Sequence, residues 1–129
     1  MSLSQEVRAF GLSLGLTDWT LNSSGVAEAA LGDDYIISVE SLDDDAIVLA
    51  TWRRPYMDAS AMEYLLRGAW LHENTPLFDV MQVGVLHQGA DTTVILARRE
   101  AASRLNSTLM ETWLAHFMGL FDAIDGHVA

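Results

Sequence analysis

The chain has 129 residues, half of them hydrophobic, with no cysteine, and its 18 acidic and seven basic residues give a formal net charge of −11. This length fits one compact domain over residues 1–129, and the hydrophobic content excludes wholesale disorder. The charge argues against a nucleic-acid binder, which needs a cationic face, and against docking on anionic lipid. The lack of cysteine excludes disulfides and thiolate chemistry and is compatible with a reducing cytosol.

The termini and apolar runs give no sign of a membrane or secretory protein. No apolar run reaches the roughly 18 residues that a membrane-spanning helix needs. The N-terminus lacks the basic stretch and apolar core of a secretory signal. The acidic surface is either an ordinary solvated surface or one that keeps an apolar binding surface soluble.

The first predicted element is a helix over residues 2–14. Ser2 and Gln5 have the spacing of a capping box, apolar residues recur at helical intervals, and Gly15 follows where helices commonly end. The turn SSG at 23–25 then leads into a short predicted strand, VAEAAL, over 26–31.

The run from Tyr35 to Trp52 predicts a β-hairpin, because two stretches rich in β-branched residues flank the polar break SLDDD. Side chains alternate across a strand, so each arm has two faces. One face carries Tyr35, Ile37, Val39, Ala46, Val48, Ala50 and Trp52, and the other carries Ile36, Ser38, Glu40, Ile47, Leu49, Thr51 and Arg53. Because the second face stays partly apolar, we expect another polypeptide to cover it.

A second helix is predicted after Pro55, which ends the strand. A capping box from Ser60 to Glu63 opens it, with Asp58 as the alternative cap. Apolar residues cover more than half of its circumference: Met62, Tyr64, Leu65, Leu66, Ala69, Trp70 and Leu71. Such a helix is either deeply buried or meets a second surface, such as a partner subunit.

Two more strands, over 80–87 and 92–97, and a long helix over 103–124 complete the predicted domain. The last helix has one apolar side: Leu105, Leu109, Met110, Trp113, Leu114, Phe117, Leu120, Phe121 and Ile124. The order α-β-β-β-α-β-β-α has no long crossover connection. It therefore predicts an α+β fold, an antiparallel sheet with helices packed on one side.

The sequence contains no recognisable catalytic motif. His72 and Glu73 are followed by Pro76 where the HExxH zinc motif needs histidine, and no pair of histidines has a metal-ligand spacing. The aspartates at 43–45 lack the glycine and distal glutamate of a calcium loop. There is also no phosphate loop and no nucleophile elbow. We therefore expect no catalytic residue, no cofactor and no metal, in a protein that is not an enzyme.

Several segments along the chain carry a family resemblance: FGLSLGL, SSG, VAEAAL with GDD and YIISVE, DDDAIVLATW, AMEYLLRGAWLHEN and ETWLAHF. In their order, and with the length and acidity, the chain resembles the class I chaperones of bacterial type III secretion systems. The resemblance spans nearly the whole chain, although no single segment is a strict motif. Where the family commonly has a small residue and then asparagine, this chain has Ala69 and Trp70.

The resemblance implies a cytoplasmic bacterial homodimer without nucleotide or metal. The N-terminal region of a secreted effector would bind in extended form, stay soluble and be presented to the secretion apparatus, whose ATPase is a candidate partner. Neither nucleic acid nor membrane insertion is implied. An acidic surface, an open sheet edge and the excess apolar surface of the second helix fit this function.

We predict two surfaces from these patterns. The effector-binding surface would lie on the first helix and first three strands, with Leu3, Val7, Phe10, Val26, Ile36, Ile47 and Leu49 as candidates. The dimer interface would use the second helix and the following strand, with Leu66, Trp70, Met81 and Val83. Core packing is the alternative for each effector-binding candidate, because the sequence does not show which face points inward.

Two other functional classes stay open. A regulatory or sensor-like α+β domain would bind a folded partner or a small ligand, and a monomer with a closed pocket would favour it. A small enzyme of unrecognised type comes third, and a buried, convergent set of polar groups would favour that class.

Overall fold

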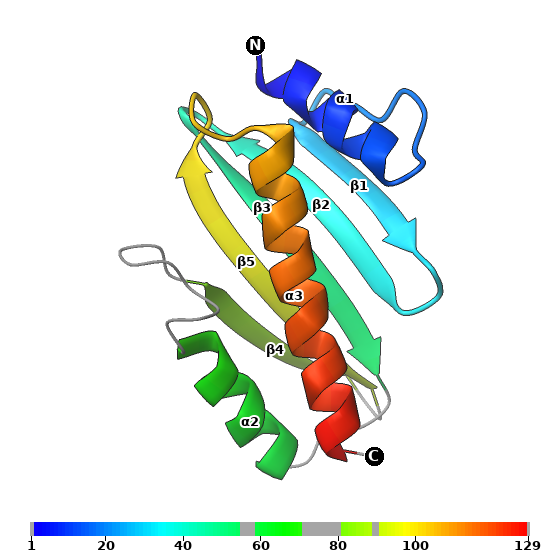
Figure 1. The fold of residues 1–129 in the computed structure, drawn as a ribbon, viewed down its shortest axis with the longest axis vertical. Coiled ribbons are helices and arrows are strands. Elements are labelled where there is room, and N and C mark those ends of the chain that lie inside the picture. Colours follow the sequence, from blue (N-terminus) through cyan, green and yellow to red (C-terminus); the bar gives the residue numbers. More distant parts are fainter. Residues whose placement is uncertain (1, 55–58, 71–80, 89–90, 129) are drawn as a thin grey trace.

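The structure is a computed structural model that describes residues 2–54, 59–70, 81–88 and 91–128 (Figure 1). Side chains are described in these ranges apart from those at 54, 59, 65, 66, 68–70, 87, 88 and 125–128. The elements in chain order are α1 (Leu3–Ser13), β1 (Val26–Leu31), β2 (Tyr35–Leu42), β3 (Asp45–Arg54), α2 (Ala59–Trp70), β4 (Gln82–Gln88), β5 (Asp91–Ala101) and α3 (Ser107–Val128).

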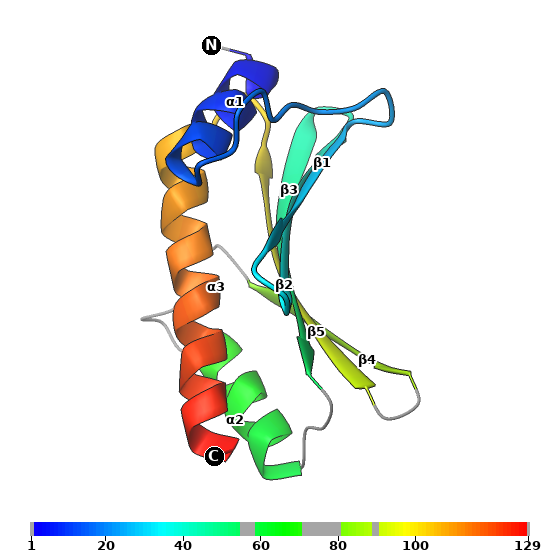
Figure 2. The same cartoon turned by 90° about the vertical axis from the view of Figure 1, so that its right-hand side faces the viewer.

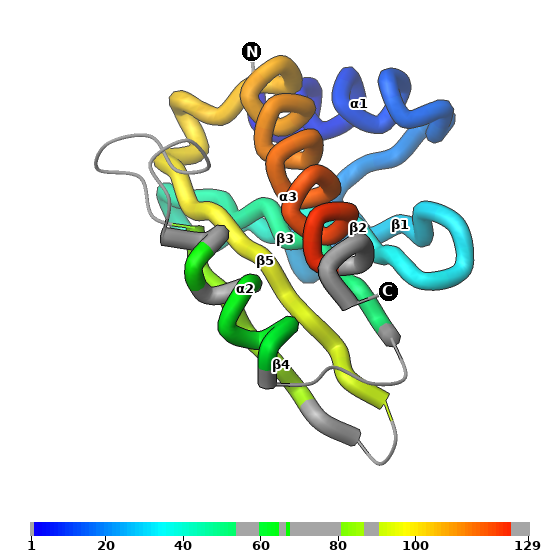
Figure 3. Tube along the Cα trace, turned by 60° about the horizontal axis from the view of Figure 1, so that its bottom comes forward, coloured from blue at the N-terminus to red at the C-terminus, as the bar shows by residue number. Residues whose placement is uncertain are grey.

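The strands form one antiparallel five-stranded sheet in the order β1-β2-β3-β5-β4, so β1 and β4 are its edges. All three helices lie on the same face of this twisted sheet (Figure 2). The longest helix, α3, runs across the middle, and α1 and α2 pack near its opposite ends (Figure 3). The predicted α+β class and element order are confirmed.

The first helix begins as its sequence predicts. The Ser2 hydroxyl accepts a hydrogen bond from the Gln5 backbone N–H at 3.2 Å, and the Gln5 side chain accepts one from the Ser2 N–H at 2.9 Å. The Glu6 carboxylate then accepts a hydrogen bond from the Ser107 backbone N–H at 2.9 Å. This bond joins α1 to the N-terminus of α3, where the helix dipole favours a negative charge.

The central hairpin has the predicted face assignment. Tyr35 pairs with Trp52 and Leu42 with Asp45 across β2 and β3. The face of the sheet beneath the helices is the more apolar one, and its buried residues include Ile37, Val39, Ala46, Val48, Ala50, Trp52, Val94 and Leu96. The α3 side chains that complete this core include Met110, Trp113, Leu114, Phe117, Leu120, Phe121 and Ile124. A single core therefore lies between one sheet face and α3.

An arginine also lies in this core layer. Arg98 on β5 is fully buried, and its guanidinium carbon lies 5.6 Å from the centre of the Trp113 ring. A guanidinium at this distance is attracted by the negative face of the indole ring. The sequence pattern does not distinguish Arg98 from its exposed neighbour Arg99, so sequence reasoning missed this contact.

Several predicted boundaries are wrong. Helix α2 begins at Ala59, so Ser60 lies inside its first turn and is not the cap; the alternative cap, Asp58, lies outside the described residues. Helix α3 begins at Ser107 rather than at 103, because the Asn106 side chain accepts a hydrogen bond from the Leu109 N–H at 2.8 Å, the geometry of an N-cap. Strand β5 is longer than predicted, since it pairs with β3 as far as residue 101.

The packing of α1 requires a glycine at position 11. A Cβ atom at Gly11 would lie 2.8 Å from Cβ of Trp19, an atom held close to its own backbone. Trp19 is fixed by a hydrogen bond from its indole N–H to the Glu28 carbonyl at 3.1 Å and by the Phe10 ring, 6.0 Å away. Moving Trp19 or α1 away from this contact would therefore break these interactions and lower the stability of the fold.

We expect Gly11→Ala to lower the free energy of unfolding by about 1–3 kcal/mol, because the overlap outweighs the gain in helix propensity. Gly119→Ala is the matched control, since this exposed α3 glycine has no atom within 4 Å of the added Cβ. The control should raise stability by up to about 1 kcal/mol. Urea unfolding of both variants checks this, and equal effects would contradict the close packing of α1 on Trp19.

Candidate protein-binding surface

The face of the sheet turned away from the helices is partly apolar and has no described element over it (Figure 2). Its apolar residues come from every strand: Val26, Ala30, Ile36, Leu42, Ile47, Leu49, Leu86, Ile95 and Ala97. Ile36 is 39 % exposed and Leu86 48 % exposed. We call this set the open face. It includes the second face of the central hairpin, which we expect another polypeptide to cover.

Strand register places polar and charged residues beside the large apolar residues of the open face. Ile47 on β3 pairs with Glu40 on β2 and with Arg99 on β5. One row further on, Leu49 pairs with Ser38 and with Ala97. Directly opposed side chains have Cβ atoms about 4.5–5.5 Å apart, so these residues form a continuous surface.

A small hollow lies on the open face. It has a volume of about 130 Å³ and is lined by Ile47, Gln82, Ala97, Arg98 and Arg99. Its apolar lining comes from Ile47 and Ala97, which lie diagonally across β3 and β5, and Gln82 and the two arginines complete it. A cavity of about 150 Å³ holds a benzene-sized molecule, so the hollow suits one apolar side chain.

Charged residues at the two ends of the open face join β3 to β5. Arg99 forms an ion pair with Asp45 at 2.7 Å, and Arg53 forms one with Asp91 at 3.0 Å. All four side chains are at least partly exposed, so each pair contributes little to stability, of order 0–1 kcal/mol. Their effect is to neutralise the two arginines of this face.

A second recess lies between α1 and α3, on the helical side of the molecule. It has a volume of about 370 Å³ and is lined by Phe10, Ser13, Leu14, Glu111, Leu114 and Ala115. Leu12 on α1 is 60 % exposed, the highest value among the large exposed hydrophobic residues of the described chain. The first helix therefore offers apolar surface, through Leu12 and Leu14 as well as through the predicted residue Phe10.

The seven predicted effector-binding residues fall into two groups. Val7 and Phe10 are fully buried in the core, which is the alternative that stayed open for them, and their role in effector binding stays a prediction. Leu3 is partly buried and packs against that core. The four strand residues lie together on the open face: Val26, Ile36, Ile47 and Leu49. Ile95, Ala97 and Leu86 were missed, although the alternation in TTVILA could have shown that Ile95 and Ala97 share a face.

The four residues predicted for the dimer interface also fall into two groups. Met81 is buried within the chain, and Val83 is half-buried on the helical face of β4. Leu66 and Trp70 lie in α2, but their side chains are outside the described set. The dimer interface thus stays a prediction.

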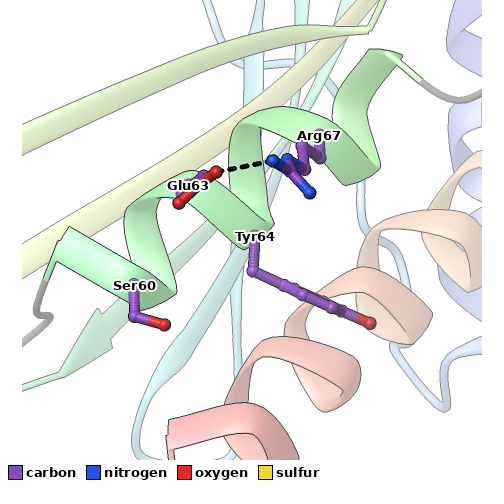
Figure 4. A pocket seen from close by; sticks show the side chains of 4 residues that line it. All are labelled: Ser60, Glu63, Tyr64 and Arg67. Carbon is purple, nitrogen blue, oxygen red and sulfur yellow. Dashed lines mark hydrogen bonds and ion pairs between the residues drawn. The ribbon is translucent and has the colours of Figure 1, made fainter.

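The described part of α2 has one shallow recess, of about 150 Å³, lined by Ser60, Glu63, Tyr64 and Arg67 (Figure 4). Glu63 and Arg67 form an exposed ion pair at 2.7 Å, one helical turn apart. The recess contains no histidine and no second carboxylate that could work with Glu63 as an acid–base pair. Its geometry is that of a solvated helix surface.

In the described ranges no group of three or more His, Asp or Glu side chains could hold a metal ion. No described helix is both long and apolar enough to cross a membrane.

The chain is similar in fold to chains of three solved complexes, one of which contains a type III secretion chaperone. It matches a chain of the HopA1–SchA chaperone–effector complex with a TM-score of 0.62 at 13 % identity, over 95 % of this chain and 89 % of that one. A chain of the complex between the Yersinia pestis type III secretion chaperone SycH and a stable fragment of YscM2 matches with a TM-score of 0.61 at 16 % identity, over 97 % and 98 %. A chain of the ExsC–ExsE complex gives 0.65 at 16 % identity, over 96 % and 92 %.

No protein-family model matches the chain, and no curated protein matches its sequence. The structural matches cover nearly the whole chain and confirm that it has the fold of type III secretion chaperones. At these identities, however, the roles of individual residues do not carry over from one protein to another.

Neighbouring residues on β2 test which face is open. Ile36→Thr should change the free energy of unfolding by less than about 1 kcal/mol, because the side chain is partly exposed and threonine suits a strand. Ile37→Thr should cost about 2 kcal/mol or more, because it removes a buried methyl group and buries a hydroxyl. Urea unfolding measures both. Equal losses in the free energy of unfolding for the two variants would show that the open face is covered in solution.

Proposed function

We propose that this protein is a type III secretion chaperone that binds the N-terminal region of a secreted effector in extended form and keeps it soluble for secretion. The observation that carries the proposal is the open face, an apolar surface spread over every strand of the sheet. The fold shared with chains of chaperone–effector complexes supports it.

An extended client fits the shape of this surface. The apolar side chains are spread across strands rather than gathered into one deep cavity. A closed ligand pocket would instead surround its ligand on most sides. Each apolar client side chain that is buried contributes about 1.5–3 kcal/mol, and several of them are needed to offset the cost of ordering a flexible segment.

The edge of the sheet gives the client a second means of binding. Strand β1 is an edge strand, and its residue Val26 belongs to the open face. On this edge the Val26 N–H and C=O are already bonded to Asn22, and the Glu28 carbonyl is bonded to the Trp19 indole. An extended segment would therefore pair through main-chain hydrogen bonds with the part of β1 after Glu28, and its side chains would reach the apolar residues beside it. The α1–α3 recess would accept a further apolar side chain from the same client.

The proposed mechanism is binding without turnover. The chaperone shields apolar client side chains from aggregation and needs no nucleotide, metal or other cofactor. The net charge of −11 keeps the free chaperone soluble despite its exposed apolar face. The protein would work in the bacterial cytoplasm and hand its client to the secretion apparatus, with the secretion ATPase as a candidate partner.

We also propose that the chaperone is a homodimer built around α2. The apolar residues of this helix exceed what packing on one side requires. A twofold interface would cover them, with Leu66, Trp70 and Val83 as candidates.

The first test is an affinity purification of the tagged protein from its native cytosol. Limited proteolysis of the captured complex should leave a protected N-terminal segment of a secreted protein, and light scattering should give two copies of this chain per client. A monomer that retains no unfolded segment would contradict the proposal.

The open face is tested by the double variant Ile47→Asp/Leu49→Asp. It should retain no more than about a tenth of the client, because two buried apolar contacts become charged. Thr108→Asp/Ala123→Asp is the matched control, since both residues are exposed on α3. The control should keep its client and its melting temperature. Equal client retention by both variants would exclude the open face as the binding surface.

The dimer is tested by replacing Leu66 and Trp70 with aspartate. Two charges in an apolar interface should yield monomer or aggregate, as measured by light scattering. A dimer of unchanged mass would exclude this interface.

A further inference from the structure

Two glutamates lie beside the apolar part of the open face, on the side of β1. Glu40 on β2 pairs directly with Ile47, one of the residues that line the hollow. Glu28 on β1 pairs with Ser38, so it is the diagonal neighbour of Glu40 on the same face. Diagonal Cβ atoms are about 7–8 Å apart, and both carboxylates can therefore reach one cationic group.

These carboxylates differ from the other charges of the open face. Within the described chain, neither Glu28 nor Glu40 forms a side-chain hydrogen bond or an ion pair, whereas Arg53 and Arg99 are each paired with an aspartate. The described part of this face therefore offers unneutralised negative charge and no unneutralised positive charge. A second copy of this chain would bring the same charge pattern and would not complement it. A partner that supplies its own cation complements it.

The hollow and the glutamates are separated by a short distance along the sheet. The hollow is centred on β5. Glu40 stands on β2, two strands away, and Glu28 on β1, three strands away, which corresponds to about 10 Å and about 14 Å. In an extended peptide, side chains two residues apart point the same way and are about 7 Å apart. The long side chain of lysine or arginine covers the remaining distance.

We propose that the open face selects client segments in which an apolar residue is followed or preceded, two positions away, by lysine or arginine. The apolar side chain occupies the hollow between Ile47 and Gln82, and the cation lies between Glu28 and Glu40. This inference rests on the proposed function and adds the chemical class of the client segment. Arg99 does not repel the cation, because Asp45 neutralises it at 2.7 Å.

A peptide selection tests this inference without knowledge of the natural client. Random 12-residue peptides displayed on phage are selected on the wild-type protein, and the enriched sequences are synthesised with a fluorescent label. Their affinities are then measured by fluorescence anisotropy for wild type, for Glu28→Gln/Glu40→Gln and for Asp33→Asn/Asp34→Asn. The last variant is the matched control, because it removes the same charge from the exposed turn between β1 and β2.

Enriched peptides should carry lysine or arginine two positions from a large apolar residue. Glu28→Gln/Glu40→Gln should weaken their binding about fivefold or more, the effect expected for loss of partly exposed ion pairs, and the control should change it less than twofold. Raising the salt concentration should remove the difference between wild type and Glu28→Gln/Glu40→Gln.

Four results would overturn the inference. Apolar peptides without a cationic preference, or peptides that bind Glu28→Gln/Glu40→Gln as well as wild type, would exclude charge selection but leave the proposed chaperone function intact. Peptides whose binding survives Ile47→Asp would exclude the hollow as the anchor site. A selection that enriches no binding peptide would count against both the inference and the proposed function.

Discussion

The packing of all three helices on one face of the sheet is the constraint on which the rest of the structure depends. Residues alternate along each strand, so the helices bury Ile37 and Val48 and leave Ile36 and Ile47 on the other side. Even Arg98 follows this alternation and lies under α3 against Trp113. The core is thus completed by one sheet face, and the apolar residues of the other face contribute nothing to it.

An uncovered apolar face is costly to keep in water and promotes association, unless charge opposes it. In this protein, carboxylates are spread around the face and its arginines are held by aspartates. On the proposed function, such a surface would stay soluble when empty and would favour an apolar, cationic partner. The same arrangement explains why a protein without a deep ligand pocket or a metal cluster among its described residues could still have a specific function.

The sequence predicted most of this fold because its signals are local. The capping box at Ser2 and the alternation in the central hairpin each depend on neighbouring residues, and both predictions were confirmed. Burial of Val7 and Phe10 depends instead on how α1 packs against α3 and Trp19, contacts that the helical period does not contain. For the same reason the sequence could not distinguish buried Arg98 from exposed Arg99, or show that Ile95 lies beside Thr51 on the open face. Which residues share a face was predictable, but which face lies toward the core was not.

The central claim, that the open face holds an extended client, is tested most directly by photo-crosslinking. A benzoylphenylalanine placed at position 49 faces away from the helices, and one placed at the exposed position 122 of α3 serves as the control. In the complex captured from native cytosol, the account predicts that position 49 crosslinks to the N-terminal region of a secreted protein and that position 122 does not. Crosslinks from position 49 only to another copy of this chain, or client crosslinks only from position 122, would contradict it.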